Sequence, residues 1–156
     1  MQTALRTHGL RPDKGLGQHF LTDPAPILRI VEAASSYAGL LEIGPGPGVL
    51  TRPLAGLDRP LLALEIDERL APVARSLAPT ADVRIGDALT APLDELLREL
   101  PAPRAVVSNM PYYITHPLTE RILAARSEWD AAILMMQKEV AEKWLAKPGD
   151  RRRGSF

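Results

Sequence analysis

The sequence predicts an α/β fold, with a mostly parallel β-sheet covered by helices on both faces. Short apolar runs alternate with segments of helical spacing from residue 24 onward, and such alternation implies right-handed crossovers between parallel strands. The apolar runs are almost uninterrupted, as is typical of strands buried on both faces. A chain of 156 residues, 46% of them hydrophobic, is long enough to bury the core of one such domain.

The individual elements follow from the length and period of each apolar run. In the first helix, for example, Ile27, Ile30 and Val31 recur at helical spacing. The expected helices cover residues 24–34, 50–57, 68–77, 93–99, 118–125 and 138–145. The expected strands cover residues 40–43, 61–65, 83–85, 105–107 and 132–136.

Both ends of the chain differ from this alternating region. Residues 1–23 are polar and basic and are predicted to form a flexible N-terminal arm, while residues 24–156 form the globular domain. Residues 147–155 are predicted to be a polar loop, and no further strand or helix follows them to close the domain. We therefore expect the domain to be incomplete at its C-terminus and the chain to be a fragment of a longer protein.

Composition excludes several kinds of site. The chain has no cysteine, which excludes disulfides, thiol nucleophiles and cysteine-ligated metals. Its three histidines lack the spacing of a metal site, so no metal is expected. No apolar run is long enough to cross a bilayer and no signal peptide is recognisable, which predicts a cytoplasmic protein without a membrane partner. The formal net charge of zero gives no support for nucleic-acid binding.

The first predicted strand ends in a glycine-rich stretch, EIGPGPG, residues 42–48. Ligands of parallel sheets bind at the carboxyl ends of the strands, and Gly44, Gly46 and Gly48 allow the backbone to turn tightly there and to approach a ligand. The two intervening prolines have no N–H group, so the loop is a poor cradle for phosphate. It predicts a ligand without a pyrophosphate or, in the simplest interpretation, a plain strand-to-helix turn.

Two acidic residues end the next two strands. Glu65 follows Gly44 by 21 positions, near the roughly 20-residue offset at which an acid binds a ribose diol. Asp87 ends the third strand and can accept a hydrogen bond from the amine of adenine. Alternatively, Glu65 is a solvated acid and Asp87 caps the following segment. Together with the glycine loop, the two acids outline an adenosine without phosphates, which fits S-adenosylmethionine.

The fourth strand ends in SNMPYYITHP, residues 108–117. If its tip faces a methyl donor, the Asn109 side-chain oxygen and the Pro111 carbonyl can hold both N–H bonds of an exocyclic amine and turn its lone pair toward the methyl group. Tyr112 can then stack on an unpaired base, with Tyr113 pointing away. The alternative is a proline-driven turn with two half-buried tyrosines.

Six stretches of the chain resemble a known family, the ribosomal RNA adenine dimethyltransferases, also called the kasugamycin-sensitivity methyltransferases. The resemblance implies a Rossmann-like class I methyltransferase domain in residues 24–156, truncated before a final hairpin and a helical C-terminal domain. The stretches are KGLGQHFL (14–21), EIGPGPGVLT (42–51), LEID (64–67), GDAL (86–89), NMPYYITHPL (109–118) and MMQKEVAEKW (135–144).

The resemblance also implies an activity, which is the S-adenosylmethionine-dependent N6,N6-dimethylation of two adjacent adenosines near the 3′ end of small-subunit (16S) rRNA. The implied partner is small-subunit rRNA in a pre-ribosomal particle, with a role in small-subunit biogenesis, and the implied state is a monomer. Matched motif by motif, the donor contacts would be His19, Leu21, Gly44, Gly46, Glu65, Asp87 and Asn109, and the target base would contact Asn109, Pro111 and Tyr112.

Some features depart from the family pattern. His19 and Tyr113 stand where many members have Asn, and Met110 replaces a common Leu. Because the final hairpin and the C-terminal domain are absent, we expect this fragment alone to bind RNA and turn over poorly. Two other interpretations stay open. One is a large-subunit rRNA adenine methyltransferase of the macrolide-resistance type, which the ITHPL and QKEVAE stretches disfavour. The other is a non-catalytic ribosome-assembly factor.

Overall fold

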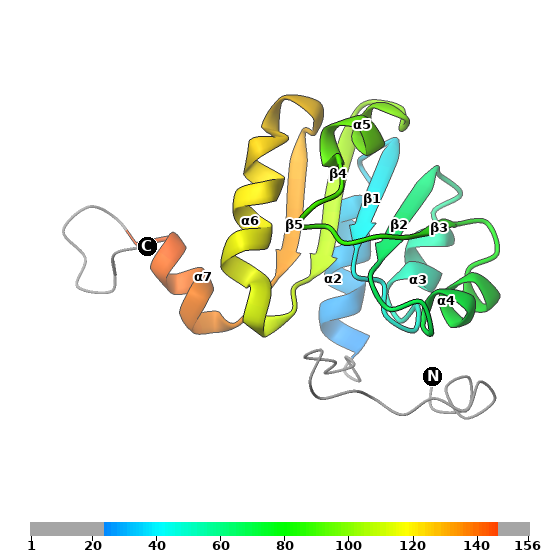
Figure 1. Cartoon of the computed structure of the whole chain (residues 1–156), viewed down its shortest axis with the longest axis horizontal. Coiled ribbons are helices and arrows are strands. Elements are labelled where there is room, and N and C mark those ends of the chain that lie inside the picture. The colour runs from blue at the N-terminus through cyan, green and yellow to red at the C-terminus, as the bar shows by residue number, and fades with distance from the viewer. Residues whose placement is uncertain (1–23, 147–156) are drawn as a thin grey trace.

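The computed structural model describes residues 24–146 and contains a five-stranded β-sheet (Figure 1). The strand order is β3-β2-β1-β4-β5, and each neighbouring pair is parallel. The predicted arm, residues 1–23, and the predicted loop after residue 146 lie outside the described residues. The strands are β1 (Gly39–Ile43), β2 (Leu61–Glu65), β3 (Asp82–Ile85), β4 (Arg104–Asn109) and β5 (Ala131–Met135).

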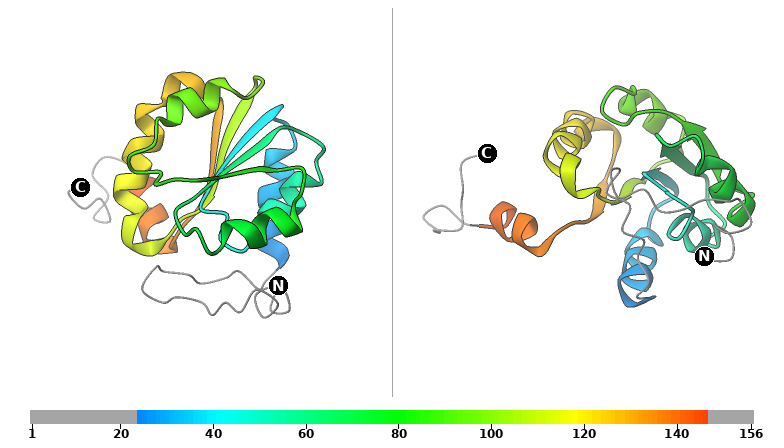
Figure 2. Two further views of the ribbon diagram at one scale, coloured as in Figure 1. Left: turned by 45° about the vertical axis from the view of Figure 1, so that its right-hand side comes forward. Right: turned by 60° about the horizontal axis from the view of Figure 1, so that its bottom comes forward.

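Helices cover both faces of the sheet (Figure 2). The first face carries α2 (Pro24–Ala34), α3 (Thr51–Ala55) and α4 (Ala71–Leu77), and the second carries α5 (Leu93–Arg98) and α6 (Thr115–Ala124). Two short 3-10 helices, η2 (Tyr112–Ile114) and η3 (Arg126–Glu128), flank α6, and α7 (Lys138–Trp144) follows β5. In Figure 1, α7 extends away from the sheet, and none of its residues is buried.

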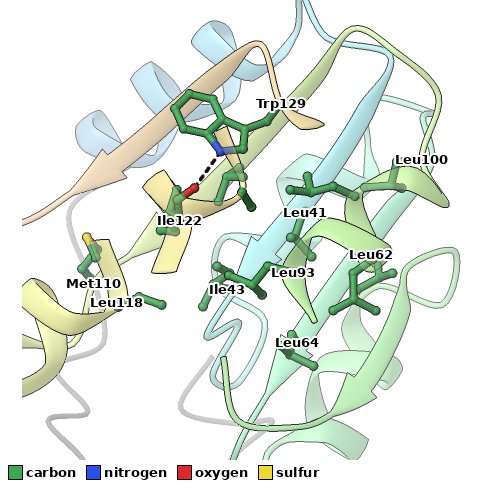
Figure 3. Packing of buried hydrophobic residues seen from close by; sticks show 14 residues of the cluster. Leu41, Ile43, Leu62, Leu64, Leu93, Leu100, Met110, Leu118, Ile122 and Trp129 are labelled. Carbon is green, nitrogen blue, oxygen red and sulfur yellow. Dashed lines mark hydrogen bonds between the residues drawn. The ribbon is translucent and has the colours of Figure 1, made fainter. Parts of the chain in front are cut away.

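The core consists of one main hydrophobic cluster on each face, because successive side chains of a strand point to opposite sides. In the cluster on the second face, Leu41 and Ile43 pack with Leu118 of α6 (Figure 3). In the cluster on the first face, Leu40 packs with Leu54 of α3. The strands therefore lie between two apolar layers, which explains why their sequences are nearly continuous in apolar residues.

A buried tryptophan fixes the connection from α6 to β5. The indole Nε1 of Trp129 donates a hydrogen bond of 2.9 Å to the carbonyl of Ile122 in α6, drawn as a dashed line in Figure 3. The guanidinium of Arg126 lies 4.3 Å from the centre of the indole ring, within range of a cation–π interaction. The polar edge of the indole is thus satisfied while its rings fill the core.

The predicted strands and helices are all confirmed, with shifts at their ends. Strand β4 runs on to Asn109, which pairs with Met135 of β5. Helix α6 begins earlier than expected, at Thr115, because Pro117 can occupy the first turn of a helix without losing a hydrogen bond. Helix α4 begins later, at Ala71, which places Pro72 in its first turn for the same reason.

The strand order places a ligand-binding crevice between β1 and β4. From β1 the chain moves outward to β2 and β3, then returns to add β4 and β5 on the other side of β1. The connections after β1 and β4 therefore diverge at the carboxyl ends of two adjacent strands, where open parallel sheets bind their ligands. The hydroxyl of Ser108 donates a buried 2.9 Å hydrogen bond to the carbonyl of Ile43 and ties these two strand ends together.

Truncation of the core is predicted to be costly on the second face. Leu97→Ala should lower the free energy of unfolding by about 2–5 kcal/mol, because Leu97 is fully buried in the cluster on this face and loss of its side chain leaves a cavity. Leu123→Ala is the matched control, since Leu123 is 56% exposed, and should change it by less than about 0.5 kcal/mol. Urea unfolding measures both, and equal losses would contradict the packing of α5 on the sheet.

Candidate functional site

A cavity of about 260 Å³ opens at the carboxyl ends of the strands, close to the lower end of small-molecule pockets at roughly 300 Å³. Its wall combines the glycine loop after β1 with the chain segments that follow β2, β3 and β4, and Ile27 and Ile30 of α2 complete it. The cavity brings together the sequence-predicted residues of the described part of the chain. They are Gly44, Gly46, Glu65, Asp87, Asn109, Pro111 and Tyr112.

The glycine loop needs its glycines for conformational reasons. Gly44, Gly46 and Gly48 have φ angles of +71°, +56° and +86°, a region that is strained for residues with a Cβ atom. At Gly44 an added Cβ would meet no described atom within 4 Å, so this glycine leaves open space beside the backbone. The loop is therefore more specialised than a plain strand-to-helix turn.

The N–H groups of the three loop glycines all donate to the protein itself. This leaves none of them for a phosphate, which agrees with the prediction that the ligand lacks a pyrophosphate. The acceptors, in order, are the Leu64 carbonyl at 2.9 Å, Glu65 Oε2 at 2.7 Å and the Pro45 carbonyl at 3.0 Å.

Glu65 connects the glycine loop to the turn after β2. Its Oε2 accepts the Gly46 N–H, and its Oε1 accepts the Asp67 N–H at 2.8 Å. The residue is 4% exposed, so it is not the solvated acid of the alternative interpretation. Burial raises the pKa of Glu65, and the two backbone donors oppose that rise. Each carboxylate oxygen can accept a further hydrogen bond, for example from a hydroxyl group in the cavity.

Asp67 and Asp87 have different roles at the cavity. Asp67 is held by Arg69 through hydrogen bonds of 2.8 and 2.7 Å from its guanidinium, so its charge is paired. Asp87 Oδ1 accepts the Leu89 N–H at 2.8 Å, which confirms part of the capping alternative. Its Oδ2 accepts no hydrogen bond from the described residues and remains available to a ligand.

The tip of β4 presents a polar side chain and a backbone turn to the same cavity. The Asn109 amide makes no hydrogen bond with the described residues and lines the cavity. The Pro111 carbonyl accepts the Thr115 hydroxyl at 3.0 Å and the Ile114 N–H at 3.3 Å, so both of its lone pairs are engaged in the turn. The carbonyl of Met110 accepts no hydrogen bond within residues 24–146, and Met110 also lines the cavity.

The two tyrosines after Pro111 lie side by side in sequence within η2. Tyr112 is 51% exposed and Tyr113 is 55% exposed, and both line the cavity. Tyr113, which is predicted to turn away from the target base and to pack at the rim or in the core, is thus a rim residue. Both residues lie in a 3-10 turn, which was not expected from the sequence.

One buried acid in the cavity was missed from the sequence. Glu42 lies in the middle of the apolar run GLLEI, is 1% exposed and lines the cavity. Its Oε2 and the nearby Thr51 Oγ1 are both buried and have no hydrogen-bond partner among the described residues. The signal available in the sequence was a lone charge inside a strand that is otherwise fully apolar.

Other expectations concern residues or groups outside this cavity wall. His19 and Leu21, the predicted donor contacts from the arm, lie outside the described residues. Within residues 24–146, no cluster of three or more His, Asp or Glu side chains could hold a metal ion. No helix in that range is both long and apolar enough to cross a bilayer.

The sheet order, the glycine loop after β1 and the acid that ends β2 define a class I S-adenosylmethionine-dependent methyltransferase fold. A dimethyladenosine transferase from Plasmodium falciparum superposes with a TM-score of 0.70 at 31% identity, over 86% of this chain and 49% of that one. The 23S rRNA methyltransferase ErmE gives a TM-score of 0.62 at 38% identity, over 80% of this chain and 50% of that one.

The chain belongs to the ribosomal RNA adenine dimethylase family, whose model matches residues 10–156. It is 43% identical, over 97% of its length, to the ribosomal RNA small subunit methyltransferase A of Ligilactobacillus salivarius. It is 44% identical, over 96% of its length, to the protein of that name from Deinococcus radiodurans. The chain spans about half the length of these curated relatives, 54% and 51%.

Two glycine substitutions should separate backbone strain from steric conflict in the loop. Gly44→Ala should cost about 1–2 kcal/mol of folding stability from its positive φ alone. Gly48→Ala should cost about 1–3 kcal/mol more, because its Cβ would lie 3.1 Å from the Ala74 Cα in α4. Thermal or urea unfolding compares the two, and a larger loss for Gly44→Ala would contradict the described loop geometry.

Proposed function

We propose that this chain contains the donor-binding and catalytic region of an enzyme that dimethylates N6 of two adjacent adenosines near the 3′ end of small-subunit rRNA. One observation supports this most directly. The Asn109 amide, which makes no hydrogen bond in the part of the chain that the structure describes, lines the same cavity as the glycine loop, Glu65 and Asp87. A target amine and a methyl donor can therefore meet at a single site. Family membership agrees with this chemistry.

The residues present fit S-adenosylmethionine. Glu65 has acceptor capacity for ribose hydroxyls, and the free Oδ2 of Asp87 suits the adenine amine. The open space beside Gly44 allows close approach of the donor to the backbone. When bound, the donor supplies an electrophilic methyl group on a positively charged sulfur. From the family resemblance we also propose that His19 and Leu21 contact it.

Asn109 and Met110 are the proposed acceptors for the target amine. The lone pair of an exocyclic amine is delocalised into the base, so the protein must hold the two N–H bonds in a geometry that frees it. Asn109 Oδ1 and the Met110 carbonyl are both without described donors, whereas the Pro111 carbonyl is engaged in the turn. Pro111 then contributes by fixing the turn. These oxygens also stabilise positive charge that develops on the nitrogen.

Tyr112 is the proposed stacking platform for the target base. Its ring is half-exposed at the cavity rim, where an unpaired adenine can lie against it. Tyr113 belongs to the same rim and is proposed to limit the width of the entrance. The position of both rings in one short turn links base binding directly to the shape of the β4 tip.

The proposed setting is a cytoplasmic monomer acting on small-subunit rRNA in a pre-ribosomal particle. The names of the relatives at 43 and 44% identity support the small subunit over the large subunit. The structural likeness to ErmE keeps large-subunit rRNA as the second candidate. A purely non-catalytic assembly role is less well supported, because Asn109 and the donor-binding acids occupy one cavity.

Removing the acid at the end of β2 should weaken donor binding. Glu65→Ala is expected to cost about 1–3 kcal/mol in S-adenosylmethionine affinity, because charge-assisted hydrogen bonds to the ribose are lost. Glu68→Ala, an exposed acid three positions along, is the control and should bind normally. Calorimetry on the folded full-length proteins gives both affinities. An unchanged dissociation constant for Glu65→Ala would remove Glu65 from the donor site.

The acceptor side is tested by single-turnover methylation of immature small subunits with the full-length protein. Asn109→Ala should lower the rate more than it weakens RNA binding, because the amide acts mainly in the transition state. Tyr112→Ala should loosen the base by about 1–3 kcal/mol, and Tyr113→Asn should have a smaller effect.

Mass mapping of the methylated adenosines then identifies the substrate. Dimethyladenosine confined to small-subunit rRNA supports the proposal, and methylation of large-subunit rRNA instead supports the second candidate. Tight binding to the subunit without any methylation would favour the assembly role. If Tyr113→Asn loses methylation activity and Tyr112→Ala keeps it, the assignment of the stacking residue is wrong.

A further inference from the structure

Glu42 is a buried carboxyl group whose charge nothing in the described structure compensates. It lies in β1, the central strand, and lines the cavity on the side of α2 and α3. One of its oxygens, Oε2, is fully enclosed and has no hydrogen-bond partner within residues 24–146. A buried polar atom without a partner is costly and rare in native proteins, so its presence in a ligand cavity points to a partner that arrives with the ligand.

The elements packed around Glu42 bring no cation to it within residues 24–146. Strands β2 and β4 place apolar Ala63 and Val107 beside it in register, and the end of β2 adds the acid Glu65. Helix α2 contributes apolar side chains to the cavity, while its charged residues are exposed. Helix α3 contributes the Thr51 hydroxyl, which lies nearby without hydrogen-bond geometry, and the basic residue of α3 is exposed.

These surroundings favour the neutral form of Glu42. Burial raises the pKa of Glu42 from 4.5 to about 8, the Thr51 side chain lowers it by less, and Glu65 raises it further. The carboxyl group is therefore mostly protonated at pH 7. Glu65 differs because two backbone N–H groups donate to it and stabilise its anion.

We propose that Glu42 holds a proton in the donor-free protein and releases it to solvent when a positively charged methyl donor occupies the cavity. The inference rests on the proposed function, because it takes the ligand to be a sulfonium cation. An anion at Glu42 is unfavourable in the empty cavity and favourable beside a cation that has left water. Glu42 thus makes the site respond to the charge of its ligand without keeping a permanent buried anion.

The proposal predicts how binding depends on pH. The bound state requires ionised Glu42, so donor affinity should rise with pH and level off above the pKa of this group. Well below that pKa, the donor affinity should rise by at most about tenfold for each pH unit. The stability of the donor-free protein should show the opposite trend. The raised folded-state pKa of Glu42 gives stability that is present below pH 4.5 and is lost as the pH rises toward 8.

The test is titration calorimetry of the full-length protein with S-adenosylmethionine at pH 7, in two buffers of different ionisation enthalpy. The difference in heat counts the protons released on binding. Wild type should release about one proton more than Glu42→Gln, which has nearly the same shape and cannot ionise. Glu32→Gln, which removes an exposed acid of α2, is the matched control and should release as many protons as wild type.

Equal proton release by wild type and Glu42→Gln, with donor bound to both, overturns this inference and leaves the proposed function standing. No donor binding by wild type overturns both. If Glu42→Gln does not fold, infrared difference spectra of wild type replace it. Loss of a protonated-carboxyl band on donor addition supports the proposal, and an unchanged band refutes it.

Discussion

The described site depends on one carboxylate, that of Glu65, which bonds to two backbone segments at once. Its two oxygens accept N–H groups from the glycine loop after β1 and from the turn after β2. These segments meet in space because β1 and β2 are adjacent and parallel. Removing a buried charged acceptor leaves donors unsatisfied and is costly, so the carboxylate fixes both the loop and the acid-rich wall of the cavity.

The acids of the cavity are arranged so that their charges do not simply add. Asp67 is paired with Arg69, Glu65 is stabilised by backbone donors, and burial leaves Glu42 neutral near pH 7. Asp87 is half-buried and uses one oxygen locally. A chain with zero formal net charge can therefore contain a cavity suited to a cation, because local placement of charges and not the overall balance determines the field in a cleft.

The fold was predictable because hydrophobic period is a strong and local signal. The apolar runs gave all five strands, and the motif positions gave the polar residues at their ends. Other features depend on contacts distant in sequence. The register of Asn109 against Met135 extends β4, and the bond from Thr115 to the Pro111 carbonyl arises only when η2 forms. Glu42 was overlooked although its apolar run predicts a buried strand, because its place in the cavity wall depends on segments distant in sequence.

The position of β1 in the sheet has a consequence for synthesis. Its partner on one side, β2, is the next strand in the chain, but its partner on the other side is β4, and the Ser108–Ile43 hydrogen bond joins residues 65 positions apart. At roughly 5–20 residues per second, the central strand has one unpaired edge for on the order of several seconds. During that interval the nascent chain displays a bare, apolar edge strand, the kind of surface that chaperones shield and that aggregation exploits.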